Sequence, residues 1–112
     1  SSAASDVYKR QPQALDYVII EADGAKHHSL KYPAADEPVI YPLTTDVIIV
    51  LGTWEKGKLC KDVEFRYELM QNELGMAEDV VVDDSVIDTL RQVYVKKLRD
   101  SGFEGRISTY YR

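Results

Sequence analysis

We expect this chain to adopt an α/β fold with a mostly parallel sheet and flanking helices. Two apolar runs, YVII at 17–20 and DVIIVLG at 46–52, are continuous rather than alternating and rich in β-branched residues. This pattern is typical of strands that are covered on both faces, as in parallel sheets. Two helical segments then precede a third β-rich run, RISTYY at 106–111. This order favours parallel pairing, because parallel strands need long crossover connections.

The first two strands are joined by residues 21–45, which show no helical or strand period. Pro33, Pro38 and Pro42 lie in this segment and disfavour a helix, since proline lacks the backbone N–H and clashes with the preceding turn. An irregular segment of this length in a small domain is usually functional or disordered.

The spacing predicts a first helix over residues 63–74, with Val63, Tyr67, Met70 and Leu74 on one face. Gly75 follows, where a left-handed residue would end the helix.

A second helix is predicted over residues 85–99, with an apolar face and basic residues in its last turn. Asp83, Asp84 and Ser85 offer N-cap oxygens, and Ser85 with Asp88 fits a capping box.

Composition limits the function classes. The 112 residues suffice for about one small domain, and the net charge of −5 argues against a nucleic-acid surface. The single cysteine, Cys60, excludes an internal disulfide framework and suits a reducing cytoplasm. No run approaches the roughly 20 apolar residues of a membrane span, and no signal peptide is recognisable. We therefore expect a cytoplasmic protein that engages neither nucleic acid nor a membrane.

The ends of the chain suggest a fragment. Residues 1–11, SSAASDVYKRQ, have no periodicity and resemble translated adapter sequence, so we set them aside as non-native. A sheet of only these three strands would leave its edge strands without pairing partners. We therefore interpret residues 12–112 as an interior fragment of one α/β nucleotide-binding-like domain whose N-terminal part is missing.

The first strand runs directly into two acids, Glu21 and Asp23, followed by Gly24. Ligands of parallel α/β sheets bind at the carboxyl ends of the strands. An acid at that position is how nucleotide hydrolases hold Mg²⁺ or orient water beside a γ-phosphate. The alternative is that Asp23 and Gly24 form the turn of a hairpin.

A near match to a phosphate-binding loop occurs at 52–59, where GTWEKGKL spells G-x-x-x-x-G-K after a strand. Leu59 stands where a hydroxyl should bind Mg²⁺, and Glu55 would repel a phosphate. We expect this segment not to be a phosphate loop.

Several motifs together resemble the YqeC family of selenium-dependent hydroxylase accessory proteins. They are E-A-D-G-A from Glu21, Leu-Lys-x-Pro ending at Pro33, E-P-V-I from Glu37, and R-x-E from Arg66 to Glu68. The resemblance covers about residues 16–100. Phe65 departs from it, since the family has histidine at this point.

The resemblance implies a partial P-loop NTPase-like, Rossmann-like domain whose phosphate loop lies upstream of Glu21. It implies a maturation factor for selenium-dependent molybdenum hydroxylases that acts as a nucleotide-dependent switch with Mg²⁺ and ATP or GTP. Glu21 would be the Walker-B-like acid and metal ligand, and Asp23 would assist it. Gly24, Lys31, Glu37, Arg66 and Glu68 would bind the cofactor or shape its site.

Two alternatives stay open. The first is a non-catalytic scaffold that binds the selenium–molybdenum cofactor or the apo-hydroxylase, because fold does not settle function. The chain as given is also expected to be inactive by itself if its phosphate loop is missing.

Overall fold

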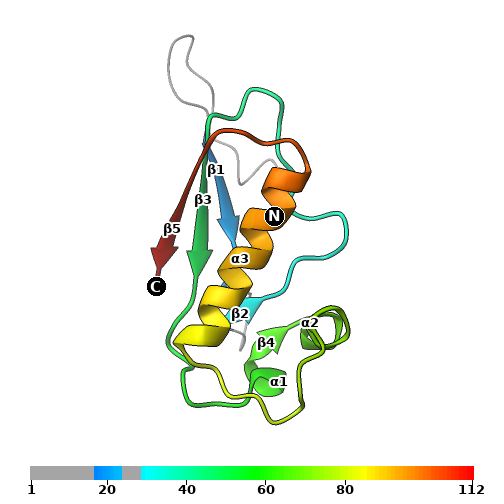
Figure 1. The fold of residues 1–112 in the computed structure, drawn as a ribbon. Coiled ribbons are helices and arrows are strands. Elements are labelled where there is room, and N and C mark those ends of the chain that lie inside the picture. The colour runs from blue at the N-terminus through cyan, green and yellow to red at the C-terminus, as the bar shows by residue number, and fades with distance from the viewer. Residues whose placement is uncertain (1–16, 24–28) are drawn as a thin grey trace.

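The computed structural model describes residues 17–23 and 29–112. Its main sheet has three parallel strands in the order β1 (Tyr17–Glu21), β3 (Asp46–Leu51) and β5 (Arg106–Tyr111) (Figure 1). The expected α/β fold with a parallel sheet and flanking helices is therefore confirmed, and all three predicted strands are present.

The strands differ in burial. β3 is the central strand, and five of its six residues are buried. In β1, by contrast, Val18 and Ile20 are buried while Tyr17 and Glu21 are exposed. The expectation of strands covered on both faces therefore holds for β3 only, whose side chains are buried on both faces and against which α3 packs.

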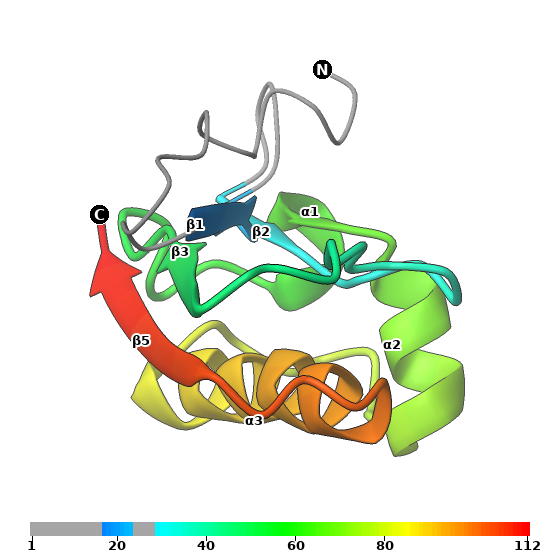
Figure 2. The same ribbon diagram turned by 90° about the horizontal axis from the view of Figure 1, so that it is seen from above.

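Helix α3 (Asp84–Asp100) covers one face of the sheet, and Figure 2 shows it running beneath the strands. Its buried positions include Leu90, Tyr94 and Leu98, at the spacing of a helical face. The helix begins one residue earlier than predicted. Its N-cap is Asp83, whose Oδ1 accepts a 2.8 Å hydrogen bond from the Val86 N–H, so the predicted Ser85 capping box is wrong.

The helix predicted over 63–74 is wrong in its first turn. The chain instead forms α1 (Cys60–Val63), the two-residue strand β4 (Glu64–Phe65) and then α2 (Tyr67–Leu74). The reason is a pairing across the molecule, in which β4 lies parallel to β2 (Leu30–Lys31). Sequence periodicity records only neighbours along the chain, so it does not reveal this pairing.

Arg66 makes the break possible. Its φ of 64° places it in the left-handed region, which a residue with a side chain rarely adopts, and it is the N-cap of α2. Gly75, with φ 67°, ends α2 as predicted. Tyr67 and Met70 are buried as expected, whereas Leu74 is exposed.

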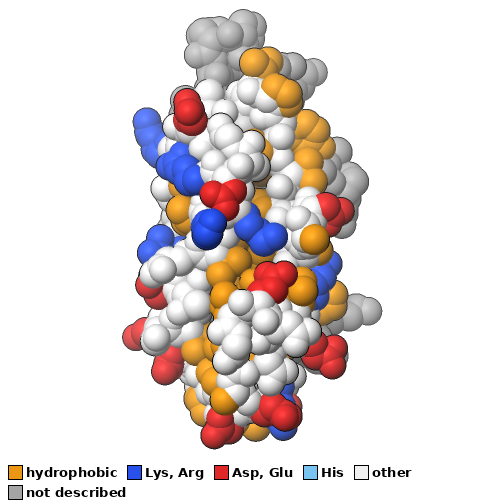
Figure 3. Space-filling model, turned by 45° about the vertical axis from the view of Figure 1, so that its right-hand side comes forward, with side chains coloured by type: hydrophobic (Ala, Val, Ile, Leu, Met, Phe, Trp, Pro, Cys, Tyr) orange, Lys and Arg blue, Asp and Glu red, His pale blue; other side chains and the backbone are white. Residues whose placement is uncertain are grey.

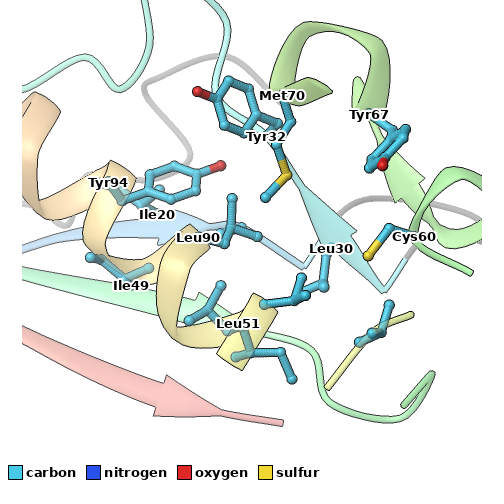
Figure 4. Packing of buried hydrophobic residues seen from close by; sticks show 14 of the residues in the cluster. Ile20, Leu30, Tyr32, Ile49, Leu51, Cys60, Tyr67, Met70, Leu90 and Tyr94 are labelled. Atoms are coloured by element: carbon cyan, nitrogen blue, oxygen red, sulfur yellow. The ribbon is translucent and has the colours of Figure 1, made fainter. Parts of the chain in front are cut away.

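The core joins the two sheets. In Figure 4, Tyr94 and Leu90 of α3 point towards Ile20 and Ile49 of the main sheet and towards the side of β2. The hydroxyl of Tyr94 donates a 2.7 Å hydrogen bond to the Lys31 carbonyl oxygen, which fixes β2 against α3. Among the helices of the described part of the chain, none is long and apolar enough to cross a membrane.

Candidate functional site

The carboxyl ends of β1, β3 and β5 lie at one edge of the sheet, which we call the carboxyl edge (Figure 1). Glu21 is the last residue of β1 and is exposed there. Asp23, two residues further on, is 5% exposed. Parallel pairing therefore places both predicted acids where α/β sheets bind ligands.

The residue after β5 completes this edge. An Arg112 guanidinium nitrogen, Nη1, lies 2.8 Å from Asp23 Oδ2 and forms an ion pair with it. The Thr53 backbone N–H and hydroxyl both donate to the Arg112 carbonyl oxygen, at 2.9 and 2.6 Å. The segments after all three strands are thus bonded together around Asp23.

Gly52 lets the chain turn closely at the end of β3. A Cβ at this position would lie 2.3 Å from the Ser29 carbonyl oxygen and 2.5 Å from the Trp54 ring. Trp54 itself is 55% exposed at this end of the sheet. This close approach requires a glycine. Packing, rather than phosphate binding, therefore explains the first glycine of the G-x-x-x-x-G-K match.

In the rest of the G-x-x-x-x-G-K match, the lysine of the pattern is engaged in an ion pair. Lys58, the lysine of the G-x-x-x-x-G-K pattern, forms a 2.6 Å ion pair with Glu55 Oε2. Helix α1, which follows, has only four residues. These contacts agree with our expectation that the segment is not a phosphate loop.

A second group of predicted residues meets at β2 and α2. Arg66 Nη1 donates to Glu37 Oε1 at 3.0 Å and to the Tyr32 carbonyl oxygen at 3.1 Å. Glu37 Oε1 also accepts a 3.1 Å bond from the Ala34 N–H, next to the cis peptide bond between Glu37 and Pro38. The E-P-V-I and R-x-E motifs, 29 residues apart, are therefore joined by an ion pair.

The charge of Glu37 is stabilised by these contacts. Burial acts to raise its pKa, but the Ala34 N–H and the nearby charges of Lys31 and Arg66 outweigh burial and lower it. Lys31, Glu37 and Arg66 thus form one electrostatic cluster, which we call the latch. Glu68 is not part of it, because the partner of Arg66 is Glu37.

The latch and the carboxyl edge are connected through the backbone. Ala22, between the two predicted acids, donates its N–H to the Val50 carbonyl and accepts a 2.8 Å bond from the Lys31 N–H. One hydrogen bond therefore joins the end of β1 directly to β2, whose residue Lys31 is part of the latch.

Two residues of the structure, Arg112 and Glu64, are not among those predicted from the sequence. Arg112 could have been found from its position after a third parallel strand. Glu64 gave no signal, because on the predicted helix it lies off the apolar face; in the structure it is 2% exposed, and neither carboxyl oxygen has a hydrogen-bond partner. Burial raises its pKa to about 8.

The carboxyl edge offers few protein ligands for Mg²⁺. Within residues 17–23 and 29–112, no group of three or more histidine, cysteine or acidic side chains is placed to hold a metal. Mg²⁺ in nucleotide sites is commonly held by one or two carboxylates together with phosphates and water. The exposed Glu21 fits that role, and Asp23 is already paired with Arg112. Gly24, the remaining predicted residue, lies outside the described residues.

The model of the YqeC protein family matches residues 2–68. The chain belongs to the YqeC family. The matched range contains the carboxyl-edge acids, the latch and Glu64. It also includes residues 2–11 of the segment 1–11, whose non-native origin stays a prediction. Comparisons with curated proteins and with solved structures give no significant match.

Proposed function

We propose that this YqeC protein is a maturation factor for selenium-dependent molybdenum hydroxylases and works as a nucleotide-dependent switch with Mg²⁺ and ATP or GTP. The observation that carries the proposal is the carboxyl edge. There, parallel strands place the exposed Glu21 beside the Asp23–Arg112 pair, where α/β sheets bind nucleotides. Family membership and the resemblance of the motifs support the biological role.

In the proposed reaction, water attacks the γ-phosphorus of the nucleotide, and the diphosphate leaves as inorganic phosphate forms. Bound Mg²⁺ would neutralise charge on the phosphates. Glu21 would hold the ion directly or through water and would orient the attacking water. Asp23 would keep Arg112 at the edge, where its remaining guanidinium N–H groups are suited to an anionic oxygen.

The switch would work through the latch. A shift at Glu21 on nucleotide binding or hydrolysis would pass through Ala22 to Lys31, whose N–H is bonded to it. Lys31 contributes to the field that keeps Glu37 charged, and Glu37 in turn holds Arg66 at the start of α2. The state of the nucleotide would thereby change the surface of the segment around residues 34–45.

The test is hydrolysis of ATP and GTP by the protein in the presence of Mg²⁺. Glu21→Gln keeps the size and removes the charge, and it should reduce turnover by a factor of about 100 or more, as expected for loss of a group acting in the transition state. The matched control is Glu104→Gln, an exposed glutamate before β5, which should leave turnover unchanged.

The alternative is a non-catalytic scaffold for the selenium–molybdenum cofactor or the apo-hydroxylase. The specific observation in its favour is that Asp23 and Glu37 are both already engaged by arginines, as in a structural framework. If Glu21→Gln supports hydroxylase maturation as well as the unmodified protein does, the switch is wrong and the scaffold is favoured.

A further inference from the structure

Trp54 is a large aromatic side chain that stays exposed at the carboxyl edge. It is 55% exposed, whereas tryptophan is highly buried on average. The residue before it, Thr53, donates both its N–H and its hydroxyl to the carbonyl oxygen of Arg112, the residue that pairs with Asp23. The backbone that carries the ring is therefore tied to the candidate site, although the reaction proposed above gives Trp54 no role.

The position of the Trp54 ring is fixed. Its Cζ3 and Cη2 atoms lie 2.5 and 2.7 Å from the point that a Cβ on Gly52 would occupy, so this edge of the ring rests on the backbone after β3. The turn that follows is anchored as well, since the Gly57 N–H donates to the Val82 carbonyl oxygen at 2.9 Å and the Lys58 carbonyl oxygen accepts from the Val82 N–H at 2.8 Å. An exposed ring on a fixed turn is a preorganised contact surface, because it loses little freedom when a ligand packs on it.

Two further aromatic side chains are exposed at the same edge. Tyr110 and Tyr111, the last two residues of β5, are 60% and 51% exposed. Leu43 is also 60% exposed, but it precedes β3 and lies at the opposite end of the sheet, where Figure 3 shows hydrophobic side chains at the surface. A ligand at the carboxyl edge therefore meets aromatic rings, which pack well against a flat aromatic group.

The Trp54 ring lies within reach of a nucleotide whose phosphates are at Glu21. Strands β1 and β3 are neighbours in the sheet, and neighbouring strands are about 4.8 Å apart. Glu21 is the last residue of β1, and Trp54 follows shortly after Leu51, the last residue of β3. One extended nucleotide therefore reaches from Glu21 to the ring, across the edge where α/β sheets bind such ligands.

The turn around Trp54 does not offer a spare polar side chain to recognise the edge of a base. The polar side chains of residues 53–58 already have partners, which are the Arg112 carbonyl oxygen for Thr53, Lys58 for Glu55, and Asp84 for Lys56. Stacking on an aromatic ring tolerates any base, because every base has a π-face. A purine has two rings and a pyrimidine one, so a purine covers more apolar surface when it stacks.

We propose that Trp54 binds the base of the nucleotide and that the substrate is a purine nucleotide, with adenine and guanine accepted alike. This inference rests on the nucleotide site proposed above and adds a binding residue to it. The base stacks on the exposed part of the Trp54 ring while the phosphates lie at Glu21. Pyrimidine nucleotides bind more weakly, because their smaller base covers less of the ring.

The test uses the NMR signal of the Trp54 indole N–H. The chain has one tryptophan, so the ¹⁵N-labelled protein gives one such signal. The probes are the Mg²⁺ complexes of ATP, GTP, UTP and tripolyphosphate, the last of which has phosphates but no base. We expect a saturable shift with ATP and with GTP, at affinities within about threefold of each other. UTP should bind several-fold more weakly, and tripolyphosphate should leave the indole signal in place.

Variants measure the contribution of the ring by isothermal titration calorimetry. Trp54→Ala should weaken binding of Mg²⁺–ATP about fivefold or more, as expected for loss of one stacked base, and should remove the preference for ATP over UTP. Trp54→Phe keeps an aromatic ring and should retain most of the affinity. The matched control is Leu74→Ala, another exposed apolar position at the end of α2, which should leave the affinity unchanged.

The outcomes separate this inference from the proposed function. If folded Trp54→Ala binds ATP as tightly as the unmodified protein, or if tripolyphosphate binds the unmodified protein as tightly as ATP, Trp54 does not hold the base. The inference is then overturned, while nucleotide binding at Glu21 is not. If none of the nucleotides binds the unmodified protein, the inference and the proposed function both fail. If Trp54→Ala does not fold, the comparison of ATP with tripolyphosphate on the unmodified protein decides.

Discussion

Replacing Glu64 by glutamine tests whether a buried carboxyl limits the stability of this protein. Glu64 lies on β4, is 2% exposed, and has no hydrogen-bond partner for either oxygen. Glutamine has nearly the same shape but cannot ionise. The substitution therefore removes the free energy required to hold a negative charge away from water, while it keeps the packing of the side chain.

The magnitude follows from the pKa. Burial raises the pKa of Glu64 from 4.5 to about 8. Because the folded state holds this proton more tightly, the stability associated with the neutral group is fully present below pH 4.5 and is lost as the pH rises through about 8. At about 1.4 kcal/mol for each pKa unit, the loss reaches about 5 kcal/mol above pH 8. This is comparable to the whole free energy of unfolding of a small domain, about 5–15 kcal/mol.

The assay is urea denaturation followed by circular dichroism at several pH values between 5 and 9. The difference in the free energy of unfolding, Glu64→Gln minus unmodified chain, should grow with pH in favour of the variant by several kcal/mol. Glu104→Gln, at an exposed position, should give a difference that does not change with pH. If the Glu64→Gln and unmodified curves run parallel over this range, Glu64 is not buried as a neutral acid and the reasoning fails.

Three further predictions use the same denaturation assay. Tyr94→Phe should lower the free energy of unfolding by about 1–3 kcal/mol, because it leaves the Lys31 carbonyl oxygen without its hydroxyl donor; no loss would mean that this oxygen is hydrated. Arg66→Ala should cost about 1 kcal/mol more than Arg66→Gly, since both remove the Glu37 ion pair but only glycine adopts a φ of 64° without strain; equal costs would contradict the left-handed backbone. Gly52→Ala should destabilise the chain by about 1–3 kcal/mol, because the added Cβ would lie 2.3 Å from a backbone oxygen; an unchanged midpoint would show that the loop after β3 can move aside.

The regular elements that the sequence predicted well are those whose pattern is local. The β-branched runs at 17–20 and 46–52 formed β1 and β3, and RISTYY formed β5 over the expected residues. Helix α3 followed its apolar period, and its N-cap is Asp83, one of the three predicted candidates, without the predicted capping box of Ser85 and Asp88. Each of these elements is specified by residues that are close neighbours along the chain.

The positions of Glu21 and Asp23 in the candidate site were also predicted from a local pattern. An acid after an apolar strand falls at the carboxyl edge whenever the strands are parallel, which fixed the place of Glu21 and Asp23. That Arg112 would pair with Asp23 depended on β5 lying next to β3. A chain position alone does not say which strands are neighbours.

The sequence by itself determined the fold class, the three strands of the main sheet and the longest helix, because hydrophobic period and β-branching act over a few residues. Tertiary structure alone decided the break before α2, the joining of Glu37 to Arg66 and the burial of Glu64. All three depend on β2 pairing with β4, a contact between residues more than 30 positions apart. The free energy of that pairing outweighs the helical preference of residues 63–66, and no local pattern encodes it.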